Sequence, residues 1–239
     1  MRAYIDLHIH SALSPCANND MTPNNIVNMS KLNGLDIIAI TDHNSVENCE
    51  AVLKCAQKVG ITAIPGMELE TSEEVHLICL FKDLEEAYFM QQIVYNALPA
   101  LENRPQIFGE QLIFDENDTI VAENKRLLLT ATNIKINEVY NIMAKFRGVV
   151  IPAHVDRQCY SIISNLGSIP KELPISYLEY SKNCKLKEFI KKNPKLEEYK
   201  YIRSSDAHNL SDILEREFWV YIDKPYNDSL VDRLSDFYR

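Results

Sequence analysis

Glycine is scarce in this chain, which has six glycines among 239 residues. Three of them, Gly34, Gly60 and Gly148, stand where predicted helices end and strands begin, as glycines after a helix commonly do. The sequence contains neither a glycine-rich phosphate loop nor a dinucleotide fingerprint. Nucleotide binding through either of these loops is therefore excluded.

An excess of basic residues is also missing, because 34 acidic residues face 25 lysines and arginines and give a net charge of −9. A nucleic-acid surface would normally carry a basic patch, so we expect polymeric nucleic acid to be an unlikely partner. A small phosphorylated substrate is compatible with the charge, since divalent cations would reverse its sign inside one pocket.

Long apolar runs are lacking as well, and no stretch approaches the roughly 18 apolar residues of a membrane span. The first six residues enter a strand pattern at once, which leaves no room for a signal peptide. We therefore expect a cytoplasmic protein without membrane contact.

None of the six cysteines forms a C-x-x-C pair, and we interpret most of them as small buried hydrophobes. Cys16 and Cys159, near the candidate site, are weaker candidates for a further role.

Apolar, β-rich runs alternate with helical patterns through most of the chain. Thr22 predicts the N-cap of a helix that ends at Gly34, and further helices are predicted over 45–60 and Ile136–Arg147. This alternation is typical of a parallel sheet, and the length suits a single α/β barrel. The predicted strands are Tyr4–Ile9, Asp36–Ile40, Ile61–Pro65, Val75–Phe81, Val149–Ala153, Ile175–Glu179, Tyr201–Arg203 and Phe218–Ile222.

The alternation breaks between about residues 83 and 135. Asp83–Leu101 is predicted to be helical, and Gln111–Phe114 and Thr119–Val121 predict a hairpin with a four-residue turn. We interpret this segment as an insertion into a single domain of residues 1–239. The insertion could cover the site and shape substrate choice, or it could be a peripheral decoration.

Each of the six histidines lies in or just after a predicted strand. In the first strand, Asp6, His8 and His10 alternate with aliphatic residues and so share one face. Burying such groups without partners would cost roughly 2 kcal/mol or more each, and a metal ion is the simplest partner for two imidazoles at this spacing. Catalytic groups of an α/β barrel lie at the C-terminal ends of its strands. The other candidates are His154, which ends the fifth strand, His76, which lies in the fourth, and five residues that follow strands: Asp42, His43, Glu68, Asp206 and His208.

In this order the motifs resemble the PHP (polymerase and histidinol phosphatase) family of metal-dependent phosphoesterases. No single motif is specific, but the ordered set is, and it covers nearly the whole chain outside the insertion. The resemblance implies a distorted seven-stranded (β/α)7 TIM-like barrel with a trinuclear metal centre at its C-terminal mouth. The motifs are Asp6-Leu7-His8-Ile9-His10, Ile40-Thr41-Asp42-His43-Asn44, Gly66-Met67-Glu68, Val75-His76-Leu77, Ala153-His154-Val155-Asp156-Arg157 and Ser205-Asp206-Ala207-His208.

The resemblance also implies which residues bind the metals. Glu68 would bridge the first metal to a second one, which His76 and His154 complete, and His43 and His208 would hold a third. The ligands implied for the first metal are His8, His10, Glu68 and Asp206.

Two positions depart from the family pattern or are ambiguous. Relatives often place an acidic or histidine ligand soon after the first motif, and Asp20 is chosen here because it stands just before a predicted helix. Its alternative role is a charge favourable to the helix dipole. Arg157 keeps its place although many relatives have proline after the histidine that corresponds to His154. It could clamp a phosphate with two bonds or form a surface salt bridge.

These residues predict hydrolysis of a small phosphomonoester, either a nucleotide or a compound like histidinol phosphate. Two to three divalent ions would activate water and polarise the phosphoryl oxygens, with Arg157 neutralising phosphate charge. His154 and His208 are the candidates for the acid that protonates the leaving group. Mixed nitrogen and oxygen ligands fit Mn, Fe or Zn.

Three other functions share part of this residue pattern. An amidohydrolase acting on C–N bonds also uses H-x-H on its first strand. Such an enzyme usually also has a bridging lysine carboxylate or two lone histidines on middle strands. Here Glu68 and the Thr41-Asp42-His43 triplet favour phosphoester chemistry instead. The acidic charge argues against a proofreading exonuclease module. The intact ligand set argues against a non-catalytic binding domain.

Overall fold

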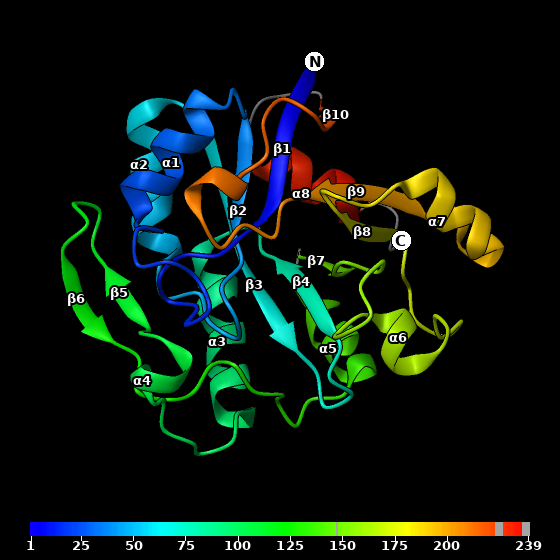
Figure 1. Cartoon of the computed structure of the whole chain (residues 1–239), viewed down its shortest axis with the longest axis horizontal. Coiled ribbons are helices and arrows are strands. Elements are labelled where there is room, and N and C mark those ends of the chain that lie inside the picture. Colours follow the sequence, from blue (N-terminus) through cyan, green and yellow to red (C-terminus); the bar gives the residue numbers. More distant parts are fainter. Residues whose placement is uncertain (147, 223–226, 236–239) are drawn as a thin grey trace.

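Six strands form the central sheet of the fold in this computed structural model, which describes residues 1–146, 148–222 and 227–235 (Figure 1). The central strands, in spatial order, are β10 (Trp219–Tyr221), β1 (Arg2–Ile9), β2 (Ile37–Ile40), β3 (Thr62–Glu70), β4 (His76–Leu80) and β7 (Val149–Pro152). Two further strands, β8 (Tyr177–Ser181) and β9 (Lys200–Ser204), form a separate sheet. In this sheet β8 contacts β7 and β9 contacts β1.

The directions of these strands correct the expected seven-stranded barrel. β1, β2 and β3 pair in parallel, as do β8 and β9, but β4 runs antiparallel to both β3 and β7. The reason is the short connection over residues 71–75, because a parallel crossover needs a dozen or more residues. Within the described residues the result is a curled, open α/β sheet rather than a closed parallel barrel.

Both faces of the central sheet are buried. The four longer helices of the first 146 residues pack on one face, where Ile38, Leu77 and Cys79 join their apolar side chains. On the other face, Ile5, Ile64 and further strand residues pack with Leu230 and its neighbours. The helices are α1 (Pro23–Leu32), α2 (Cys49–Val59), α3 (Leu84–Ala97) and α5 (Ile136–Met143) on the first face, and α8 (Asn227–Ser235) on the second.

Local signals at the helix ends are confirmed in part. The Thr22 hydroxyl accepts a bond from the backbone N–H of Asn25, and Gly60 ends α2 in the left-handed conformation at φ 75°. The second helix begins at Cys49, four residues later than predicted, and the predicted end of α5, Arg147, lies outside the described residues. No helix of the described residues combines the length and apolarity that a membrane span requires.

The predicted hairpin is confirmed as β5 (Leu112–Phe114) and β6 (Ile120–Glu123). It lies at the edge of the fold near α1 and α2 (Figure 1), where Asp118 accepts bonds from Thr22 and Asn24. Helix α3, in contrast, contributes Ala87, Met90 and Val94 to the main core. The boundaries of the insertion stay a prediction.

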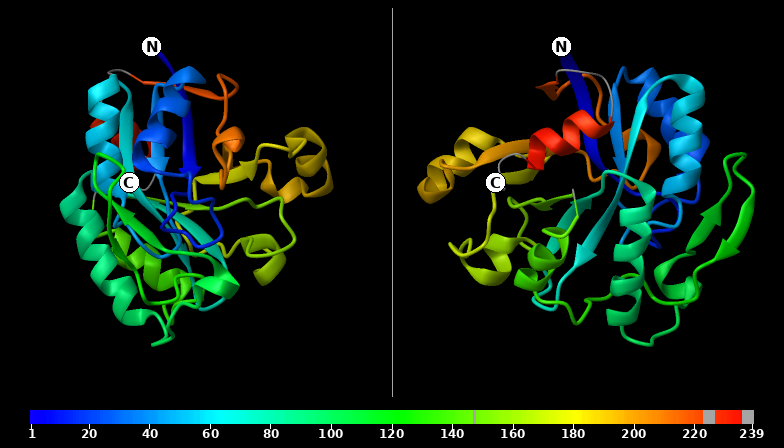
Figure 2. Two further views of the ribbon diagram at one scale, coloured as in Figure 1. Left: turned by 60° about the vertical axis from the view of Figure 1, so that its left-hand side comes forward. Right: turned by 180° about the vertical axis from the view of Figure 1, so that it is seen from behind.

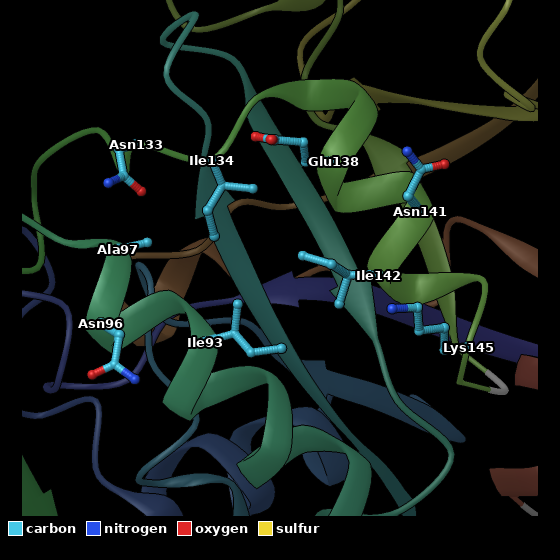
Figure 3. A pocket seen from close by; sticks show the side chains of 9 residues that line it. All are labelled: Ile93, Asn96, Ala97, Asn133, Ile134, Glu138, Asn141, Ile142 and Lys145. Carbon is cyan, nitrogen blue, oxygen red and sulfur yellow. The ribbon is translucent and has the colours of Figure 1, made fainter.

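A pocket of about 590 Å³ opens between α3 and α5, with Ile93 and Ile142 facing each other across it (Figure 3). None of the predicted ligands lines it, so it is separate from the candidate site. Its lining residues are Ile93, Asn96, Ala97, Asn133, Ile134, Glu138, Asn141, Ile142 and Lys145.

Candidate metal centre

Glu68 is the centre of a buried cluster of histidines. It lies on the same face of β3 as Ile64, because the two are separated by an even number of residues, and it is 1% exposed. Imidazole nitrogens from several elements approach its two oxygens at 2.8 to 3.3 Å. These nitrogens belong to His8, His10, His43, His76 and His154.

Asp206 forms the second acidic part of the cluster. It follows β9, and one of its oxygens lies 3.2 Å from Nε2 of His8 and 3.1 Å from Nε2 of His10. Its φ of 53°, like the φ of 28° at His154, is unusual for a residue with a side chain. Strain of this kind persists where surrounding contacts over-determine the backbone, commonly at functional sites.

Three groups of side chains offer ligand atoms that lie within 4.8 Å of one another. All six histidines, Glu68 and Asp206 are therefore brought into one cluster, with His154 joining through its 3.1 Å approach to Glu68. The first group repeats the predicted ligand set of the first metal. The groups are His8, His10, Glu68 and Asp206; His43, Glu68 and His76; and His10, His43 and His208.

Asp20 is not brought into the cluster. Its side chain is exposed, and among the described residues it belongs to none of the three ligand groups. Its backbone N–H donates to Asn18, and its carbonyl accepts from Asn25 at the start of α1. The geometry therefore favours the alternative role of Asp20 beside a helix N-terminus.

Two buried carboxylates orient His8 in β1 and His10 directly after it. Asp42 was among the candidates from the sequence, whereas Glu179 was not predicted. The two oxygens of Glu179 lie 3.1 and 3.0 Å from Nδ1 of His8. Asp42 accepts a bond from Ser14, whose hydroxyl lies 2.9 Å from Nδ1 of His10. Partners of this kind fix the ring orientation of a metal-binding histidine. The available signal for Glu179 was its place at the end of a predicted strand.

Asp6, in contrast, serves the backbone and not the cluster. Its carboxylate accepts bonds from the N–H groups of Ser205 and Leu214, each at 3.0 Å. These bonds hold the segment that carries Asp206 and His208 against β1. The β1–β2 register is irregular between Asp6 and Ile9, so simple alternation does not describe where these side chains point.

The protonation states of the cluster follow from burial and from close opposite charges. Burial raises the pKa of Glu68, but His76, His8 and His43 outweigh this and hold it well below its usual range. Burial lowers the pKa of His43 well below the usual range. For His76, burial lowers the pKa, but Glu68 and Glu70 outweigh it and raise it to about 9.

The cluster fits divalent metals on its own chemistry. Nε2 of His8 and Nε2 of His10 face each other at 3.1 Å beside the oxygens of Glu68 and Asp206, so lone pairs converge on a common space. Nδ1 of His154 is buried and has no hydrogen-bond partner among the described residues. A divalent cation would accept these converging lone pairs and would replace the protons that some of the side chains carry in its absence.

Arg157 and Tyr160 form part of the rim. One guanidinium nitrogen of Arg157 lies 2.5 Å from Asp206, while its side chain is 45% exposed. The Tyr160 ring stacks on His76 with 4.6 Å between centroids. The buried ligands therefore meet the solvent beside a cationic and an aromatic side chain.

Comparison with known families agrees with this arrangement, because residues 6–150 match the PHP domain, more than half of the chain. The chain belongs to the PHP domain family. Members of this family are metal-dependent hydrolases, and this chain is therefore a metal-dependent hydrolase. The match includes His8, His10, His43, Glu68 and His76 and ends before the last three predicted ligands, His154, Asp206 and His208.

Curated relatives of this PHP-domain chain match only part of it. An uncharacterized protein of Methanocaldococcus jannaschii is 30% identical over 76 residues, which are 28% of this chain and 44% of that protein. A 5'-3' exoribonuclease of Haemophilus influenzae is 30% identical over 78 residues, covering 31% of this chain and 27% of that protein.

Solved structures share the fold over nearly the whole chain. A lesion-specific endonuclease from Pyrococcus furiosus has a TM-score of 0.74 at 20% identity and covers 99% of this chain, which spans 56% of that protein. A metal-dependent phosphoesterase from Bifidobacterium adolescentis, described as putative, has a TM-score of 0.59 at 17% identity, with 85% and 87% covered.

One further structure corrects an expectation from the sequence. Endonuclease Q in complex with a 27-mer duplex that has an abasic lesion at the active site has a TM-score of 0.71 at 19% identity, with 99% of this chain and 57% of that one covered. The expectation that polymeric nucleic acid is an unlikely partner is therefore wrong. Net charge was a poor guide because binding depends on where the charges lie.

Proposed function

We propose that this PHP-domain chain hydrolyses phosphate esters with two to three divalent metal ions bound at the cluster. The observation that carries the proposal is Glu68, a buried carboxylate with five imidazoles within 3.3 Å of its oxygens. Such ions, when bound, activate water and neutralise charge on the phosphoryl group. Mn, Fe and Zn all fit imidazole and carboxylate ligands.

The residues of the chain would position the ions and the ester. Glu68 would be shared between two ions, because it belongs to two of the three ligand groups. Glu179 and Ser14 would hold His8 and His10 in their orientations. Arg157, half-exposed at the rim, would bind the non-bridging phosphate oxygens with its planar fork.

The first candidate substrate is a small phosphomonoester, since nothing more than a phosphate is needed to engage Arg157 and the ions. A nucleic-acid phosphodiester is the second candidate, and a basic segment favours it. Residues 182–203 contain seven lysines and one arginine against three glutamates, although the whole chain carries −9. Charge of this kind contacts phosphate backbones.

The basic segment begins at the rim of the cluster. Lys182 follows the β8 strand that carries Glu179, and its ammonium donates to Asp212, four residues after His208. The chain then enters α7 (Leu186–Lys192), which projects from the rest of the fold (Figure 2). Four exposed lysines here form no ion pair within the described part of the chain: Lys187, Lys191, Lys192 and Lys195.

A substrate panel tests these proposals. Purified protein, loaded separately with Mn, Zn or Fe, is assayed on p-nitrophenyl phosphate, bis(p-nitrophenyl) phosphate, a single-stranded oligonucleotide, an abasic duplex and an amide. Elemental analysis of the same samples should give two to three ions per chain. A metal content near zero after supplementation would overturn the proposed function, and amide without ester hydrolysis would favour the amidohydrolase alternative.

A charge-reversed variant separates the two substrate candidates. Lys191→Glu/Lys192→Glu should weaken oligonucleotide binding and lower its salt dependence by about one for each lost phosphate contact. Hydrolysis of p-nitrophenyl phosphate should not change. The matched control is Lys31→Glu/Lys125→Glu, which reverses two exposed charges outside the segment. Equal binding by both variants would exclude the segment as the nucleic-acid contact.

A further inference from the structure

Tyr160 is a bulky residue in the left-handed backbone conformation at the rim of the cluster. Its φ is 58°, and a residue with a large side chain is a genuine outlier at such a value. Backbone strain of this kind persists where the surrounding structure over-determines the residue, commonly at active sites and ligand clamps. The position of this ring is therefore imposed by the fold and not by local preference.

Hydrogen bonds on both sides hold the backbone around Tyr160. Its carbonyl accepts a 2.9 Å bond from the N–H of His76. The next residue, Ser161, is fully buried, and its hydroxyl donates to the carbonyl of Arg157 at 2.9 Å. The same hydroxyl accepts from the N–H of Ser164 in α6 (Ile162–Leu166). One turn of the chain thus links Tyr160 to a predicted metal ligand and to Arg157.

The ring of Tyr160 has one covered face. That face stacks on the His76 ring, with 4.6 Å between the centroids and 20° between the planes. The residue is nevertheless 45% exposed, which leaves the face opposite His76 open to solvent. An open aromatic face beside the guanidinium of Arg157 suits a ligand that combines a planar ring with negative charge.

We propose that Tyr160 determines specificity by stacking on a planar aromatic group that the phosphate ester carries. This inference rests on the proposed function and names the class of ester that the site prefers. The phosphate would engage Arg157 and the ions, while the aromatic group lies on the open face of Tyr160. A nucleobase and a phenyl ring both supply such a group, because stacking needs only a π face.

Matched pairs of esters test the role of the ring. Adenosine 5′-monophosphate is compared with ribose 5-phosphate, which lacks only the base, and phosphotyrosine is compared with phosphoserine. The metal-loaded chain should have the higher kcat/KM for the aromatic member of at least one pair, and the pair identifies the source of the ring. Both members are assayed on one sample, so a change in metal content cancels from their ratio.

Two variants at this position separate the ring from the backbone. Tyr160→Gly should abolish the preference, a change in the kcat/KM ratio of about 5- to 150-fold, the usual range for losing one stacked base. Tyr160→Phe keeps the ring and should retain the preference. A tyrosine that only shields His76 would affect both members of a pair equally.

The matched control also places glycine at a left-handed position. Glu74 is exposed, has a φ of 58° and carries no ring. Glycine adopts this conformation without strain, so Tyr160→Gly and Glu74→Gly should both fold, which circular dichroism would check. Glu74→Gly should keep the substrate preference of the parent chain.

Fluorescence adds a readout that does not depend on turnover. If the base is the preferred group, the zinc-loaded chain should quench 2-aminopurine riboside 5′-phosphate, and Tyr160→Gly should not. A chain that hydrolyses phosphate esters without preference in either pair, or whose preference survives in Tyr160→Gly, overturns the role of Tyr160 and leaves the proposed function standing. A chain that hydrolyses no ester overturns the proposed function, and unquenched fluorescence would then overturn the role of Tyr160 as well.

Discussion

His8 and Glu179 form a carboxylate–imidazole pair in which Nδ1 of the ring lies 3.1 and 3.0 Å from the two carboxylate oxygens. Glu179 also accepts a 2.9 Å bond from the backbone N–H of His154. One buried carboxylate thus orients a ring on β1 and fixes the strained backbone of a second histidine. The remaining nitrogen of His8, Nε2, is left to face Glu68 and Asp206.

The first prediction concerns this pair. Glu179→Gln should lower metal affinity about 10- to 100-fold, the usual effect of losing a partner behind a ligand, because the amide removes the charge that holds His8 in its tautomer. Competition with a chromogenic chelator would measure the change. The control is Glu172→Gln, an exposed glutamate outside the cluster, and equal affinities in the two variants would contradict the role of Glu179.

The second prediction concerns the shared carboxylate. Glu68→Gln should lower turnover by about 100-fold or more, because residues that bind the ions directly set their activity. The fold should stay intact, because the core is aliphatic. His8→Ala should behave in the same way. Glu70→Gln, on the same strand but outside the three ligand groups, should lose much less. Turnover and circular dichroism on the same samples decide, and full activity in Glu68→Gln would remove it from the centre.

Most of the histidines and Glu68 could be predicted from the sequence because they end or directly follow a short apolar run, whereas His76 lies inside one. Chain order then limits which strand ends can meet. The antiparallel β4 was missed although its residues were predicted to form a strand. Strand direction depends on the length of the connection before it, and the five residues 71–75 are too few for a parallel crossover. An apolar run by itself does not encode direction.

Residues that act through another side chain were the hardest to predict. Glu179 and Ser14 lie within ordinary polar sequence. Glu179 contacts His8, 171 residues away in the chain, and Ser14 links His10 to Asp42, which lies 28 residues after Ser14. The choice of Asp20 rested on family position, whereas the fold turns its side chain to solvent. Local pattern cannot supply contacts that only the folded loops create.

The third prediction is a loss of stability in alkali. Burial raises the pKa of the Cys49 and Cys79 thiols from 9.0 to about 12, so above pH 9 the unfolded chain loses protons that the folded chain keeps. The contribution of these thiols to the free energy of unfolding is therefore fully present below pH 9. It falls between pH 9 and 12, by up to about 1.4 kcal/mol per pH unit for each thiol. Denaturant unfolding at pH 8 and pH 10 measures the fall.

A pair of variants tests the origin of this alkaline slope. In Cys79→Ala the free energy of unfolding should fall less steeply with pH, by up to the equivalent of one proton. The small cavity should also lower the free energy of unfolding by a constant amount at every pH. Cys159→Ala, which removes an exposed thiol, should flatten it less. Identical slopes in the two variants would assign the alkaline loss to other groups.

The last prediction concerns Arg157, whose guanidinium lies 2.5 Å from Asp206 while nearly half of its side chain is exposed. If Arg157 binds the phosphate of the substrate, Arg157→Ala should reduce kcat/KM for a phosphate ester. The loss in transition-state stabilisation should be roughly 1.5–3 kcal/mol, the value of a charge-assisted bond. Arg157→Lys should recover only part, because lysine keeps the charge but lacks the planar fork.

Because Arg157 also contacts a ligand carboxylate, metal content must be measured on the same samples. Equal metal content with weaker inhibition by inorganic phosphate in Arg157→Ala would place the lost energy in phosphate binding. Arg104→Ala, which removes a guanidinium that lies over the Phe108 ring, serves as the control. Equal inhibition of the parent and Arg157→Ala would mean that the ions alone bind phosphate, and Arg157 would then act only by holding Asp206 in place.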